Sequence, residues 1–231
     1  MYFNTSYWLY MLPAILLTML AQWYVSSAYK KWSRVQSQNR VTGSEVAQRL
    51  MRYGGIYNVQ IEGVRGNLTD HYDPRQKVLR LSEGVYRGQS VAAMAIAAHE
   101  LGHAAQDQEG YIPLRLRAML VPAVNIGSYL GWILIMIGLL LGMTDLAWLG
   151  VVVFSGGAAF ALATLPVELN ASARAKRLLA ESGLIMGAEE QRGVNTVLNA
   201  AALTYVAALF TAIMQLLYFV SLIGGFGGRR D

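Results

Sequence analysis

Charged residues occur along the chain in blocks that alternate with long uncharged stretches. Residues 1–29, 118–144, 146–167 and 193–228 contain no Asp, Glu, Lys or Arg. Each stretch is long enough for the ~20 apolar residues that a helix needs to cross a bilayer. The pattern therefore predicts four membrane-spanning helices, at residues 7–28, about 119–142, about 147–164 and within 197–222.

The block between the first two uncharged stretches, residues 30–117, has the composition of a water-exposed domain. Thr42 is followed by Glu45 three residues later, with flanking valines, which is the pattern of a capping box with a hydrophobic staple. We expect a helix from there to Tyr53, where Gly54 and Gly55 stop it.

A small sheet and a second helix are expected further along this block. Residues 57–61 and 78–82 show strand patterns, and residues 70–74 supply turn chemistry between them. The strand at 78–82 could be a sheet edge to which a peptide adds, or an ordinary buried strand. Residues 90–106 predict a slim, alanine-rich helix that is packed on several sides.

The second and third spans are separated by only a few residues around Asp145, so they predict a hairpin. Because a hairpin crosses the membrane twice, the segments before and after it lie on the same side. The stretch after Pro166 predicts a separate charged helix over 167–182, closed by Gly183. Residues 224–228 are expected to form a flexible tail.

Composition and charge agree with a membrane protein. Hydrophobic residues make up 55% of the chain and charged residues 14%, against roughly 25% charged in soluble domains. This argues against a soluble or disordered protein. The net charge of +5 comes from residues 30–117, and no basic-aromatic motif accompanies it, so we expect no nucleic-acid partner.

The basic residues predict the orientation in the membrane. Six of them flank the first two spans, and such positive clusters favour the cytoplasmic side. The positive charge follows the first span, whereas in a signal peptide it precedes the apolar stretch, so we expect a retained anchor with its N-terminus outside. Arg229 and Arg230 would then lie outside, a mild violation of the rule. The flanking residues are Lys30, Lys31, Arg34, Arg40, Arg115 and Arg117.

The sequence His99-Glu100-Leu101-Gly102-His103 carries the clearest chemistry. Two histidines at i and i+4 lie on one helical face about 6 Å apart, where both can bind one metal ion. Glu100 lies beside that position and can accept a proton from water, as in zinc peptidases. Chance produces this pattern about 0.0015 times in a chain of this composition. The alternative without a metal is a pair of structural histidines beside an exposed glutamate.

A catalytic zinc needs a third protein ligand and one open position. The chain has no cysteine, and its remaining histidine is His71. Glu168 is the better candidate, because it follows the hairpin and so returns to the side of the two histidines. An isolated carboxylate at a membrane boundary also needs a partner, although a helix N-terminus could supply it.

Six segments of the chain match a known family: LTDHYDP (68–74), KVLRLS (77–82), VY (85–86), AAHELGHAAQ (97–106), LPVELNAS (165–172) and, more weakly, VLNAAALTYVAA (197–208). These segments resemble the YugP-type membrane zinc metallopeptidases of bacteria. The resemblance covers most of the chain after residue 40. It implies that His99, His103 and Glu168 bind zinc and that Glu100 is the catalytic base. The more distant HtpX-type proteases have an Asp where this chain has Ser172, which puts the partner assumed for those enzymes in doubt.

Together these observations predict a mainly α membrane protein with about four transmembrane helices and a small α+β zincin-like domain. The expected divisions are an anchor (1–29), a cytoplasmic domain (30–117), a transmembrane hairpin (118–166), a cytoplasmic helix with the third ligand (167–192), and a last span with its tail (193–231).

The expected function is zinc-dependent hydrolysis of peptide bonds at the cytoplasmic surface of a bacterial cell membrane, through a zinc-activated water. Polypeptides, including membrane-associated ones, are the expected substrates, and the lipid bilayer is the expected surroundings. His71, Tyr72 and Arg80 are candidates for polarising the scissile carbonyl. The alternatives are a non-enzymatic membrane adaptor with a structural zinc, which needs a fourth protein ligand such as His71 or Asp70, and a helical scaffold without metal.

Overall fold

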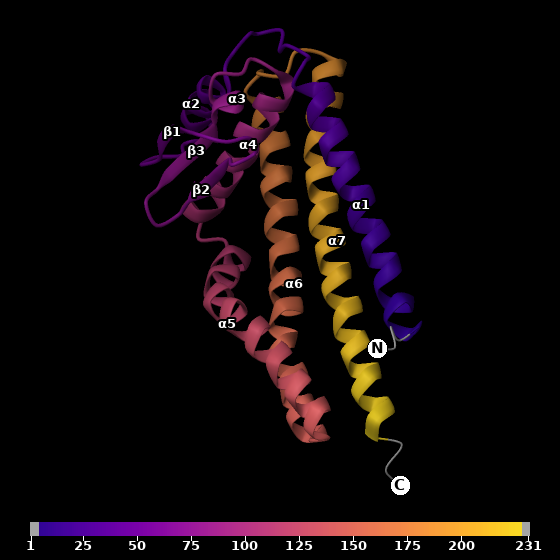
Figure 1. Cartoon of the computed structure of the whole chain (residues 1–231). Coiled ribbons are helices and arrows are strands. Elements are labelled where there is room, and N and C mark those ends of the chain that lie inside the picture. The colour runs from indigo at the N-terminus through magenta and orange to yellow at the C-terminus, as the bar shows by residue number, and fades with distance from the viewer. Residues whose placement is uncertain (1–4, 228–231) are drawn as a thin grey trace. The chain divides into compact units, whose positions relative to one another are not determined.

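A computed structural model of the chain describes residues 5–227, and helices dominate it (Figure 1). The helices are α1 (Thr5–Trp32), α2 (Gly43–Gly54), α3 (Glu83–Tyr86), α4 (Val91–Gln108), α5 (Ile112–Leu141), α6 (Thr144–Glu181) and α7 (Ala188–Gly227). The strands are β1 (Gln60–Val64), β2 (His71–Asp73) and β3 (Val78–Ser82).

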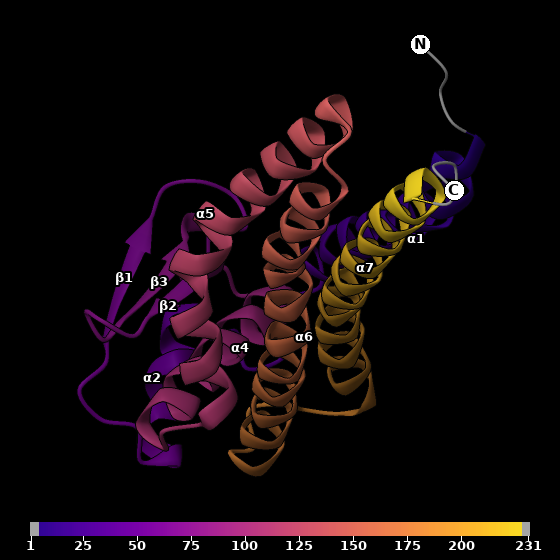
Figure 2. The same ribbon diagram turned by 90° about the horizontal axis from the view of Figure 1, so that it is seen from below.

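Four helices are long and apolar enough to cross a membrane, at Ser6–Trp32, Val124–Leu141, Thr144–Glu181 and Ala188–Gly225. The predicted class, a mainly α membrane protein with a small α+β part, is thereby confirmed. Only Gly142 and Met143 separate α5 from α6, and Figure 2 shows this short connection of the predicted hairpin.

The described residues divide into two compact units. The first consists of residues 5–20, 115–165 and 204–227, which come from α1, α5, α6 and α7. Apolar side chains from three of these helices form its buried cluster, in which Phe154 and Phe219 also meet edge to face at 5.2 Å. The buried members are Ile135, Ala147, Val151, Phe219 and Ile223.

The second unit consists of residues 21–114 and 166–203 and contains the sheet. The strand order is β1-β3-β2, with β3 parallel to β1 and antiparallel to β2. Because β3 has a neighbour on each side, residues 78–82 form the buried strand rather than a sheet edge. Its apolar side chains Leu79 and Leu81 are fully buried in the cluster that also holds the alanine face of α4.

The predicted helix ends agree with the structure. Thr42 caps α2 in a capping box with Glu45, and Gly55 follows in the left-handed conformation at φ 60°. Ser90 caps α4 by accepting a hydrogen bond from the Ala93 amide at 3.1 Å. Gly183, at φ 70°, follows the end of α6 as expected.

Four local predictions differ from the structure. The first strand lies at 60–64 rather than 57–61, and residues 71–73 within the expected turn form β2, with the turn following at Pro74. Residues 167–182 do not form a separate helix, because α6 continues through Pro166. A membrane helix tolerates proline when neighbouring groups satisfy the freed backbone. The expected flexible tail is helical up to Gly227, and residue 228 lies outside the described part of the chain.

Candidate metal centre

Helix α4 carries His99 and His103 one turn apart on the same face. Their rings lie edge to face, with centroids 4.9 Å apart and planes at 86°. Each side chain is 12% exposed, so the pair is largely shielded but still reachable from solvent. This is the arrangement that the i, i+4 spacing predicts.

Glu168 approaches both histidines from α6. Its Oε2 lies 3.2 Å from Nε2 of His99 and 3.5 Å from Nε2 of His103, and its side chain is 3% exposed. A buried carboxylate is costly without partners, and here the two imidazoles provide them. The structure therefore brings together the three residues that sequence reasoning selected as metal ligands.

Close packing between the two helices makes this meeting possible. A Cβ atom placed on Gly102 would lie 2.6 Å from the backbone oxygen of Ala171. Real side chains do not approach a carbonyl this closely, so glycine is required where α4 crosses α6. Sequence reasoning recognised Gly102 only as an unspecified position between the two histidines.

The far nitrogen of each imidazole also has a partner. Nδ1 of His99 lies 3.1 Å from Oγ of Ser172, and Nδ1 of His103 lies 3.0 Å from Oε1 of Gln106. Although this chain has Ser172 where HtpX-type proteases have an Asp, His99 keeps a polar partner there, the Ser172 hydroxyl. Gln106 was not singled out from the sequence, although its position three residues after His103 places it on the same helical face.

The donor set suits a zinc ion. Two imidazole nitrogens and one carboxylate oxygen are ligands that zinc takes in catalytic sites. With bond lengths of about 2.0–2.1 Å and tetrahedral angles, two such ligand atoms are separated by roughly 3.4 Å. The oxygen of Glu168 already lies 3.2 and 3.5 Å from the two nitrogens, and all three donor atoms lie within 4.8 Å of one another.

Electrostatics around His103 reflect the same convergence. Burial lowers the pKa of its imidazole, but the hydrogen bond to Glu168 and the negative charges of Glu100 and Glu168 outweigh burial, so the pKa is raised. The charge of Glu100 therefore acts on one of the three candidate ligands.

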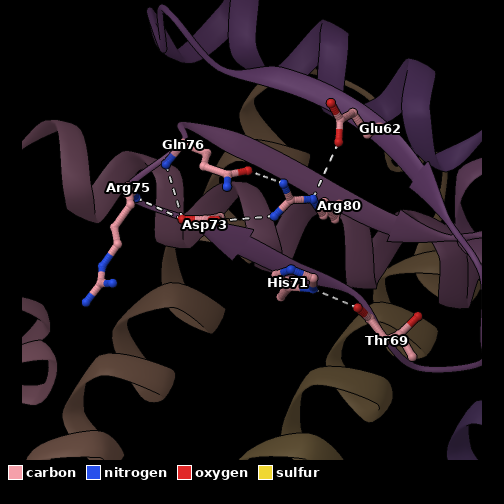
Figure 3. Close-up of polar contacts among 7 residues, drawn as sticks. All are labelled: Glu62, Thr69, His71, Asp73, Arg75, Gln76 and Arg80. Carbon is pink, nitrogen blue, oxygen red and sulfur yellow. Dashed lines mark hydrogen bonds and ion pairs between the residues drawn. The ribbon is translucent and has the colours of Figure 1, made fainter. Parts of the chain in front are cut away.

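The three candidates for polarising a carbonyl do not join this group. Arg80 lies on the sheet, where it pairs with Asp73 at 3.2 Å and Glu62 at 3.4 Å (Figure 3). Nδ1 of His71 lies 2.8 Å from the Thr69 carbonyl oxygen, a contact drawn as a dashed line in the same figure. The Tyr72 hydroxyl donates to Asp107 at 2.7 Å. Each candidate thus has a partner of its own.

Comparison with known proteins agrees with this donor set. A family model described as "Putative neutral zinc metallopeptidase" matches residues 7–224. The chain belongs to this family of zinc metallopeptidases. It is 48% identical over 209 residues to "Putative membrane protease YugP" of Bacillus subtilis (strain 168), covering 90% of this chain and 92% of that protein. No solved structure matches the chain.

Proposed function

We propose that this protein is a membrane zinc endopeptidase in which His99, His103 and Glu168 hold the metal and Glu100 is the catalytic base. The observation that carries the proposal is the convergence of two imidazole nitrogens on one buried carboxylate oxygen, at 3.2 and 3.5 Å. Membership of a zinc metallopeptidase family supports the same reading.

Zinc bound by these three residues would supply Lewis-acid activation of water and of the peptide carbonyl. The described residues offer one group of three or more His, Asp or Glu side chains suited to a metal. A structural zinc site closes all four positions with protein ligands, whereas a catalytic site keeps one open. Three ligands therefore support a catalytic site over the alternative of an adaptor with structural zinc.

Glu100 would move the proton during hydrolysis. As water adds to the peptide carbonyl carbon, a C–O bond forms and the Glu100 carboxylate accepts the proton that water loses. The protonated Glu100 then gives that proton to the amide nitrogen as the C–N bond breaks. The products are a carboxyl group and an amine, and Glu100 returns to its ionised form.

The proposed substrates are polypeptides at the cytoplasmic surface of a bacterial cell membrane. The basic residues that follow the first span and precede the second one support this orientation. In it, residues 30–117 and 167–192 lie on the cytoplasmic side and the N-terminus lies outside. Position near a membrane favours membrane-associated or unfolded chains as substrates. Trapping by a Glu100→Gln variant tests this, and recovery of purely soluble small peptides would count against it.

The decisive experiment measures bound zinc and casein-type proteolysis in wild type, Glu100→Gln and Glu168→Ala. Glu100→Gln should retain zinc and lose proteolysis, because it removes the base without removing a ligand. Glu168→Ala should lose both, because two imidazoles remain. Proteolysis that survives Glu100→Gln would contradict the mechanism, and wild-type protein without zinc would favour the metal-free scaffold.

A further inference from the structure

Gln106 is a polar side chain with no exposed surface, held between α4 and α6. Its Nε2 donates to the Val167 carbonyl oxygen at 2.8 Å and to Oδ1 of Asn170 at 2.9 Å. Its Oε1 lies 3.0 Å from Nδ1 of His103. Both N–H donors of this amide are therefore directed at the helix that carries Glu168, and its carbonyl oxygen is directed at the metal centre.

The orientation of the Gln106 amide follows from its partners. A backbone carbonyl oxygen can only accept, so the atom that faces Val167 must be the NH2 group. The atom that faces His103 is then the carbonyl oxygen, which also only accepts. Nδ1 of His103 must consequently carry a proton and donate it.

Asn170 supports the same orientation of the Gln106 amide. Oδ1 of Asn170 accepts from Gln106 and also from Nε of Arg174, at 2.7 Å. A guanidinium group only donates, so Asn170 has to present its oxygen to both neighbours. Arg174 is in turn paired with Glu109 at the end of α4. Each donor and acceptor between Arg174 and the imidazole of His103 therefore has one assignment: Arg174 and Gln106 both donate to Asn170, and His103 donates to Gln106.

We propose that Gln106 is a positioning residue of the metal centre, which in the zinc-loaded site holds His103 in the tautomer with Nδ1 protonated and so leaves the Nε2 lone pair to bind the ion. This inference rests on the proposed function, because the lone pair matters only if Nε2 binds a metal. In the opposite tautomer, Nε2 would carry a proton and could not act as a ligand.

His99 provides an internal contrast. Its Nδ1 meets the Ser172 hydroxyl at 3.1 Å, and a hydroxyl can both donate and accept. Ser172 therefore orients the ring of His99 without dictating its tautomer. Gln106 therefore constrains the tautomer of His103 more strongly than Ser172 constrains the tautomer of His99.

The same amide also links the two helices that carry the ligands. Its acceptor on α6 is the carbonyl of Val167, the residue immediately before Glu168. Gln106 thereby fixes the proton position on one ligand and the backbone beside another. Partners of this kind on ligating histidines typically change metal affinity 10- to 100-fold when removed.

The test compares the full chain, purified in detergent, with its Gln106→Met, Gln106→Glu and Ser172→Ala variants. Zinc affinity is measured by competition with a chelating dye. Gln106→Met keeps the volume but removes every hydrogen bond, and about 10- to 100-fold weaker binding is expected. Gln106→Glu keeps an acceptor toward Nδ1 and should restore part of the loss, while Ser172→Ala should lose less than Gln106→Met.

Proton and 15N NMR of histidine-labelled, zinc-loaded protein reads the tautomer directly, independently of proteolysis. Wild type and Gln106→Glu should show a His103 Nδ1–H that is protected from exchange with water, and Gln106→Met should lose this protection. The proposal is overturned if wild type lacks this proton, or if Gln106→Met keeps both the protected proton and wild-type zinc affinity.

The two proposals fail in different ways. Wild-type protein that binds no zinc at all removes the metal centre itself. Wild-type protein that binds zinc, together with a Gln106→Met variant that is indistinguishable from it, removes only the role of Gln106.

Discussion

The backbone of Ala171 lies against Gly102 with no room for a side chain between them: a Cβ on Gly102 would come within 2.6 Å of the Ala171 oxygen. Since Gly102 lies between the two histidines and Ala171 lies three residues after Glu168, this contact sets the distance between the ligands. A change at Gly102 should therefore affect the metal centre without altering any ligand.

Gly102→Ala should separate α4 from α6, destabilise the protein by about 1–3 kcal/mol through overpacking, and weaken zinc binding. Bound zinc and thermal unfolding are the measurements. Gly84→Ala is the matched control, because a Cβ at Gly84 meets only the Tyr29 hydroxyl, at 3.7 Å. A Gly102→Ala variant with wild-type zinc affinity would show that the contact does not control ligand spacing.

Zinc should raise the apparent melting temperature of the chelator-treated wild type, because a ligand that binds only the folded state stabilises it. At a free concentration 100 times Kd, the expected gain is about 2.7 kcal/mol. His99→Ala should show little of this gain, since it removes one of the three donors. His71→Ala serves as the control histidine, and an equal zinc response in wild type and His99→Ala would argue against the assigned ligands.

Loss of the α2 cap should reduce the stability of the protein without affecting zinc binding at the metal centre. Thr42 accepts from the Glu45 amide at 3.2 Å and its own amide donates to Glu45 Oε2 at 2.7 Å. Thr42→Ala should cost about 0.5–2 kcal/mol while zinc bound per folded molecule stays constant. Thr196→Ala, where the hydroxyl bonds only a carbonyl of its own helix, should change stability less. Equal losses in the two variants would rule out the cap as the cause.

Asp70 should give stability a distinct pH dependence. Burial raises the pKa of its carboxyl group despite hydrogen bonds from Ser82. The folded state therefore holds this proton more tightly than the unfolded state, and the contribution of Asp70 to stability falls as pH rises from its ordinary pKa through the raised one. Relative to wild type, Asp70→Asn should gain stability across that interval. Parallel melting-temperature curves for the two proteins between pH 4 and 7 would contradict this.

Sequence patterns predicted the parts of the molecule that local chemistry determines. The capping box of α2 and the strand at 78–82 are local features, and both occur where expected. The contact between Glu168 and the two histidines joins distant parts of the chain. The predicted hairpin nevertheless placed the segment that contains Glu168 on the same side of the membrane as the histidines. Glu168 then stood out as an isolated carboxylate at a membrane boundary, which needs a partner.

The remaining features depend on tertiary contacts. Residues 71–73 become a strand because β3 offers them a partner, and α6 continues through Pro166 although proline alone predicts a break. The roles of Gly102 and Gln106 arise only once α4 meets α6. The spacing of three residues between His103 and Gln106 was a usable signal, yet one sequence cannot distinguish a buried glutamine from an exposed one.

The separation of the ligands along the chain affects when activity can begin. His99 and His103 are synthesised well before Glu168, with α5 and the larger part of α6 in between. A nascent or truncated chain that ends before residue 168 has two imidazoles but no third ligand, so in the proposed site it cannot complete a catalytic zinc. Proteolytic activity would therefore arise only after translation has passed the hairpin.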